Sequence, residues 1–94
     1  MIARDGLAAV ADGLAAAGVS VSPWDVDGGV QFSFSVWSGG VAGVGEALMW
    51  GRVEWWDSER LFVVHVWDFC GRSVSRRFRS VRGAVSCVVC RWVS

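Results

Sequence analysis

The sequence contains no lysine, asparagine, threonine or tyrosine. Codons for these residues are rich in adenine, so the composition suggests a high-GC source, and we hypothesise a small accessory gene of a phage or mobile element. The missing lysine also excludes a phosphate-binding loop. Such a loop requires a lysine followed by serine or threonine, and the glycine-rich stretch 38–45 lacks that pair.

Long apolar runs are missing as well. The longest uncharged apolar runs, such as residues 61–64, are far shorter than the roughly 20 residues that a helix needs to cross a bilayer. Asp5 and Asp12 interrupt the region that a secretory signal would have to keep apolar. We therefore expect a cytoplasmic protein that has no membrane partner.

Cysteine and histidine are scarce. The three cysteines are an odd number, which a disulfide framework would not leave, and we expect them to stay reduced. His65, Cys70, Cys87 and Cys90 together suggest a zinc site. However, Cys90 would point away from the buried stripe of the last helix, and His65 would lie on the other face of the sheet, so the four side chains could not converge on one metal ion.

A redox role for Cys87 and Cys90 is disfavoured because a reactive cysteine pair normally lies at the start of a helix. We expect no metal and no cofactor.

Catalytic spacing is also missing. His65 is the single histidine, and no serine–histidine–acid spacing surrounds it. Arg52 would face His65 across a hairpin and would disfavour its protonated form. The acidic residues fall mostly in expected turns and loops, where solvated roles dominate. We therefore expect no enzymatic activity.

What the chain does have is apolar residues in regular patterns. At 53% hydrophobic and 19% charged, its 94 residues predict one small globular domain over residues 1–94. A helix is predicted over residues 3–17, with Gly18 suited to end it. A second helix is predicted over residues 81–92. Its apolar stripe consists of Val81, Ala84, Val85, Val88 and Trp92, with Val89 at the margin.

Between the helices the period changes from helical to alternating. Residues 30–37 alternate apolar and polar side chains, which predicts a half-buried strand. Residues 49–69 predict a hairpin with Ser58 and Glu59 at its tip, and a turn over 68–72 leads into a strand over 73–79. Residues 19–22 predict a short extended lead-out. The expected fold is α+β: an N-terminal helix, a three- or four-stranded antiparallel meander and a C-terminal helix, with both helices on one face of the sheet. A competing interpretation begins the last helix near Ser75 and leaves three strands.

The turn at residues 57–60 sets the register of the central hairpin. One face then pairs Trp55 with Phe62, Val53 with Val64, and Gly51 with Val66. The other face pairs Trp50 with Trp67, Arg52 with His65, Glu54 with Val63, and Trp56 with Leu61.

The second of these faces is the predicted working surface. Its tryptophans, with Leu61 and Val63, predict an exposed apolar patch edged by arginine, and tryptophan and arginine are enriched at the energetic centres of protein interfaces. The alternatives are that the loop 38–46 or the N-terminal segment covers this face, or that a homodimer buries it. The hypothesis is a non-enzymatic module that docks onto a protein partner and modulates or inhibits a host protein. The predicted partner-binding residues are Trp37, Trp50, Arg52, Trp56, His65, Trp67 and Arg77.

Nucleic acid is the alternative partner. Residues 1–59 hold two arginines against eight acidic residues, whereas residues 60–94 hold seven arginines against one acidic residue. Arginines follow phosphates and aromatic sheet faces stack bases. The order helix, three strands, helix resembles the double-stranded RNA-binding fold, and the strand–strand–helix ending resembles the arm-binding domains of phage integrases. Zero net charge and Glu54 on the aromatic face count against this alternative. Its predicted site is Arg72, Arg76, Arg77, Arg79 and Arg82.

Overall fold

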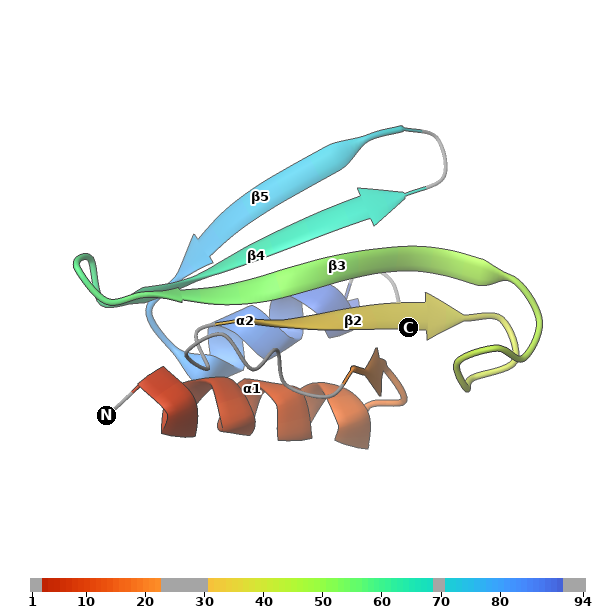
Figure 1. Ribbon diagram of the computed structural model, residues 1–94, viewed down its shortest axis with the longest axis horizontal. Coiled ribbons are helices and arrows are strands. Elements are labelled where there is room, and N and C mark those ends of the chain that lie inside the picture. The colour runs from red at the N-terminus through yellow and green to blue at the C-terminus, as the bar shows by residue number, and fades with distance from the viewer. Residues whose placement is uncertain (1–2, 23–30, 69–70, 91–94) are drawn as a thin grey trace.

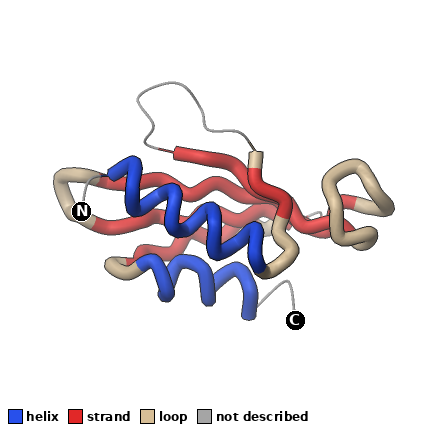
Figure 2. Tube along the Cα trace, turned by 90° about the horizontal axis from the view of Figure 1, so that it is seen from below, coloured by secondary structure: helices blue, strands red, loops and turns tan. Residues whose placement is uncertain are grey.

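The computed structural model describes residues 3–22, 31–68 and 71–90. Helices α1 (Ala3–Ala16) and α2 (Val81–Val88) lie side by side under one face of an antiparallel sheet (Figures 1 and 2). The strands are β1 (Ser20–Val21), β2 (Gln31–Trp37), β3 (Ala47–Trp56), β4 (Leu61–Asp68) and β5 (Ser73–Phe78), in that spatial order. The predicted α+β class is confirmed. We call the helix-covered side of the sheet the inner face and the opposite side the outer face.

The predicted number of strands was too small, because the sheet has five. The additional strand is β1, in which Ser20 pairs with Ser35 on β2. Its position follows from the end of α1, where Gly18 adopts a positive φ of 91°. There the Val19 N–H donates to the Leu14 carbonyl at 3.0 Å, closing a Schellman turn that directs the chain back along the sheet. The sequence indicated an extended segment here but gave no partner for it.

The register predicted for the central hairpin is confirmed at every pair. Trp56 lies opposite Leu61 beside the turn, Trp55 lies opposite Phe62, and the pairing continues to Trp50 with Trp67. Residues 57–60 form the turn, with Arg60 at a φ of 53°. The three-strand interpretation was wrong, because β5 pairs with β4 along its full length before α2 begins.

The core lies between the inner face and the two helices. Phe62 is fully buried, and the rings of Trp55 and Phe62 lie 4.9 Å apart between centroids. Gly51 also belongs to this face, because a Cβ there would overlap the His65 carbonyl oxygen and meet the Phe34 ring at 2.5 Å. The Phe34 ring therefore packs directly on the backbone of β3, a close approach that glycine permits.

The helices pack through their predicted stripes. Leu7, Val10 and Leu14 of α1 are fully buried, as are Ala84 and Val88 of α2. Helix α2 begins after Ser80, whose hydroxyl accepts a hydrogen bond from the Gly83 N–H at 3.0 Å.

A close contact joins the two helices. A Cβ on Gly13 would lie 2.8 Å from the Val85 side chain, so this glycine gives α2 room to approach α1. Trp92 and Cys70 lie outside the described residues. Among the described helices, none is long and apolar enough to span a membrane.

Candidate functional site on the outer face of the sheet

The outer face carries a network of charged and aromatic side chains centred on Glu54. The Arg52 Nη2 lies 2.9 Å from the Glu54 Oε1, and the His65 Nε2 lies 3.1 Å from the same oxygen. The Trp56 indole N–H donates to the Glu54 Oε2 at 3.0 Å. Arg52, Glu54 and Trp56 are alternate residues of β3, and His65 on β4 lies opposite Arg52.

The protonation of Glu54 follows from these contacts. Partial burial raises the pKa of this carboxyl, but the indole hydrogen bond from Trp56 and the charges of Arg52 and His65 outweigh that effect. The pKa of Glu54 is therefore lowered from its ordinary value. A carboxylate thus stays in the middle of an otherwise aromatic and cationic surface at neutral pH.

His65 also contacts a residue that the sequence did not associate with it. The Ser75 hydroxyl lies 2.7 Å from the His65 Nδ1, because Ser75 on β5 is the cross-strand partner of His65. No serine–histidine–acid spacing along the chain signals this contact, because it forms between strands. Strand pairing brings Ser75 and Glu54 to opposite sides of the imidazole, although they are far apart in the chain. This order resembles a serine–histidine–acid relay, but it lies on a broad sheet face, where it holds the imidazole in place.

Trp56 and Trp67 of this face each have an arginine side chain over the ring. The Arg77 guanidinium lies over the Trp56 ring at 5.3 Å from its centroid, and the Arg52 guanidinium lies over the Trp67 ring at 5.8 Å. The His65 ring stacks on Trp67, with centroids 6.0 Å apart and planes inclined by 22°. Six of the seven predicted partner-binding residues therefore lie on β3, β4 and β5, and five of these six take part in the contacts described here.

Two residues expected in the exposed patch are buried instead. Leu61 is 9% exposed and Val63 is 2% exposed, yet neither belongs to the core between the sheet and the helices. Leu61 lies across from Trp56, and Val63 lies between Glu54 and Arg77 in the register. The long side chains of the outer face cover these two aliphatic residues. The apolar patch is consequently smaller than the sequence indicated.

The apolar surface that remains exposed lies toward the opposite end of β3. Trp50 is 43% exposed and Leu48 is 48% exposed. A β-bulge lies here, because Val36 pairs with Met49 but Trp37 pairs with Ala47, which leaves Leu48 as the extra residue. The sequence analysis missed Leu48 because a regular strand pattern carries no signal for a bulge.

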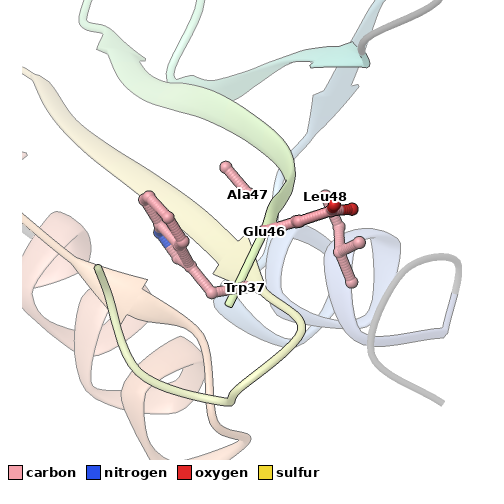
Figure 3. Close-up of a pocket in the computed structure, with 4 residues that line it drawn as sticks. All are labelled: Trp37, Glu46, Ala47 and Leu48. Carbon is pink, nitrogen blue, oxygen red and sulfur yellow. The ribbon is translucent and has the colours of Figure 1, made fainter. Parts of the chain in front are cut away.

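Trp37, the seventh predicted partner-binding residue, lies beside this bulge. Its indole N–H donates to the Ser35 hydroxyl at 2.9 Å, which fixes the ring along β2. Trp37, Glu46, Ala47 and Leu48 line a shallow hollow where β2 ends and β3 begins (Figure 3). The loop 38–46, which connects β2 and β3, extends beyond the ends of these two strands (Figure 1), and its Val41 and Val44 are exposed.

The arginines of the alternative site do not share one surface. All five are exposed. Arg77 lies on the outer face over Trp56, whereas Arg76 lines a second hollow on the inner side of β5 with Phe78 and residues of α2. Arg72 lies at the far end of β5, in the turn from β4.

Cys87 and Cys90 lie on the opposite side of the sheet from His65. Cys87 and Cys90 border the hollow between β5 and α2, whereas His65 is on the outer face. The described residues contain no group of three or more side chains able to hold a metal ion.

Comparisons with known proteins give this surface no precedent. Comparison with protein-family models, curated proteins and solved structures finds no significant match.

Proposed function

We propose that the protein acts as a binding module that docks the outer face of its sheet onto a protein partner. The observation that carries this proposal is the arrangement at the start of β3, where exposed Trp50 and Leu48 lie near Trp67, the cross-strand partner of Trp50, which has the Arg52 guanidinium over its ring. Large aromatic side chains supply most of the free energy at many protein interfaces. Soluble proteins rarely expose them together without use.

Preorganisation supports the same proposal. Binding loses free energy when flexible side chains become fixed at an interface. Trp37 and Trp56 are fixed in the free protein by hydrogen bonds to Ser35 and Glu54. A partner that covers these rings therefore orders fewer side chains than it would on an unstructured surface. If the partner needs the surface that this protein covers for another interaction, docking inhibits that interaction.

The electrostatics of the face favour a protein over nucleic acid. Glu54 remains ionised in the centre of the face and repels phosphate, while its contacts occupy the Arg52 guanidinium. Arg76 and Arg77, two of the five arginines of the nucleic-acid alternative, lie on opposite sides of the sheet. A protein surface can place an apolar side chain against Trp50 and a polar group near Arg77.

A matched pair of variants tests the proposal. Trp50→Ser with Trp67→Ser removes aromatic surface from the outer face. Val41→Ser with Val44→Ser removes exposed apolar surface from the loop 38–46, away from that face. Both variants and the unaltered protein are immobilised and used to capture proteins from a host lysate, with and without nuclease.

We expect a nuclease-resistant partner that the unaltered protein and the loop variant capture and the tryptophan variant does not. Thermal unfolding followed by circular dichroism shows whether each variant is folded. Equal capture by both variants would contradict the proposal, as would a partner lost on nuclease treatment. Unfolding of the tryptophan variant would assign those rings to the core instead.

A further inference from the structure

The edge strand β5 has backbone groups that face away from the rest of the sheet. In the sheet order, β5 is the last strand, so one side of it pairs with no described strand. The Asp68 N–H donates to the Arg72 carbonyl at 3.1 Å, which makes these residues a hydrogen-bonded pair. Hydrogen-bonded and non-hydrogen-bonded pairs alternate in an antiparallel ladder. The backbone N–H and C=O groups of Ser73, Ser75 and Arg77 therefore point outward, away from β4.

The charge along this edge is positive. Arg76, Arg77 and Arg79 are all exposed and form no ion pair with any residue in the described ranges. Arg76 lies on the inner side of the strand and Arg77 on the outer side, because successive side chains alternate. The edge thus combines outward hydrogen-bonding groups with uncompensated positive charge on both of its sides.

We propose that an acidic, extended segment of a partner protein adds to β5 as a sixth strand. Main-chain hydrogen bonds to Ser75 and Arg77 would supply affinity, and carboxylates on successive residues of the segment would reach Arg76 on one side and Arg77 on the other. The hollow between β5 and α2, which Phe78 and Cys87 help to line, accepts an inner-facing side chain of the added strand. This surface is separate from Trp50 and does not depend on the proposed function of the outer face.

The same charges disfavour two other occupants. A second copy of this chain that paired its β5 with this one would bring arginines against arginines, and like charges across a strand pair are destabilising. A nucleic-acid backbone offers phosphate oxygens, which accept hydrogen bonds but do not donate, so the outward carbonyls of β5 would gain no donor from them. An acidic strand supplies donors, acceptors and negative charge together.

A proline substitution tests the backbone contact directly. Ser75→Pro removes an outward N–H without removing a hydrogen bond of the sheet, and proline is tolerated on edge strands in that orientation. Ser75→Ala is the matched control, because it removes the same hydroxyl contact with His65 and keeps the N–H. The probe is a fluorescein-labelled peptide of about eight residues, a common strand length, built from valine and threonine around consecutive glutamates. A second peptide carries lysine in place of glutamate.

In fluorescence anisotropy we expect the acidic peptide to bind the unaltered protein and Ser75→Ala with equal affinity. Its affinity for Ser75→Pro should be lower by a factor of up to roughly ten, as the loss of one hydrogen bond implies. Arg76→Glu with Arg79→Glu should reverse the preference toward the lysine peptide. The Trp50→Ser, Trp67→Ser variant should bind the acidic peptide normally, so failure of the outer-face proposal would be seen separately. Circular dichroism confirms that each variant is folded.

Three results would overturn the proposal. Equal binding of the acidic peptide by Ser75→Pro and Ser75→Ala would show that the backbone edge is not used. A concentration-dependent dimer in sedimentation that Ser75→Pro abolishes would assign the edge to a second copy of the chain. Binding of a labelled oligonucleotide at physiological salt, lost in the arginine double variant but kept in Ser75→Pro, would assign the arginines to nucleic acid.

Discussion

Trp55 and Trp56 are neighbours in the chain, yet they lie on opposite faces of the sheet and are stabilised in different ways. Trp55 packs against Phe62 in the core and is 9% exposed, and its indole N–H reaches Asp57 at 3.4 Å. Trp56 stays partly exposed between Glu54 and Arg77. The inner face gains its stability from burial, whereas the outer face gains its order from polar contacts. One residue type therefore serves the fold on one face and is available for recognition on the other.

The largest expected effect breaks the inner face. Phe62→Ala removes a fully buried ring, and such changes cost about 3–5 kcal/mol of stability. Trp56→Ala on the outer face removes one hydrogen bond and one cation–π contact, for which about 1–2 kcal/mol is expected. Chemical denaturation of both variants measures the difference. Equal losses would show that the two faces are not stabilised differently.

Gly51→Ala is the next test of the inner face. The added methyl group would overlap the His65 carbonyl and the Phe34 ring, and overpacking of this kind costs about 1–3 kcal/mol. Gly40→Ala serves as the control for methyl addition, since a Cβ there meets nothing within 4 Å, although the φ of 82° adds its own strain. If Gly51→Ala proves no worse than Gly40→Ala in thermal unfolding, the close packing of Phe34 on β3 is not required.

Glu54→Gln tests the polar network of the outer face. The pKa of Glu54 is lower in the folded protein than in the unfolded chain, so its stabilising effect is present above the ordinary glutamate pKa of about 4.3. That effect is lost as the pH falls through the lowered folded-state pKa. We expect the variant to lose about 1 kcal/mol at neutral pH, and the difference from the unaltered protein to shrink in acid.

Glu59→Gln is the control for this pH dependence. Glu59 lies exposed in the turn 57–60 and forms no ion pair with a described residue. Urea denaturation at neutral and acidic pH should therefore show a pH-dependent difference for Glu54→Gln and little for Glu59→Gln. The same difference in both variants would remove the special role of the Glu54 network.

The smallest expected effect on stability belongs to Trp50→Ser. Trp50 is 43% exposed, and substitutions of exposed side chains away from the core usually change stability by less than about 0.5 kcal/mol. Binding to the partner, in contrast, should be lost. A loss of stability comparable to that of Phe62→Ala, measured by denaturation, would place Trp50 with the inner face and not with the recognition surface.

Local patterns account for much of the fold. Alternation along residues 31–37 and 49–67 fixed which side chains face the helices, because a strand repeats every second residue. The turn at 57–60 then set the register, so that Trp50 lies opposite Trp67 and Arg52 lies opposite His65 as predicted. Helical spacing likewise identified the buried stripes of α1 and α2. Each of these features depends on neighbours in the chain or across one short turn.

The remaining features needed the tertiary structure, because they depend on residues that only the assembled sheet brings together. Pairing of β1 with β2, the burial of Val63 under side chains from two other strands, and the meeting of Ser75 with His65 and Glu54 join distant segments. Gly13 reads as a weak helical residue in the sequence, yet it makes room for Val85. The sequence by itself determined which tryptophans leave the core. The packing of neighbouring strands decided which of them remain exposed.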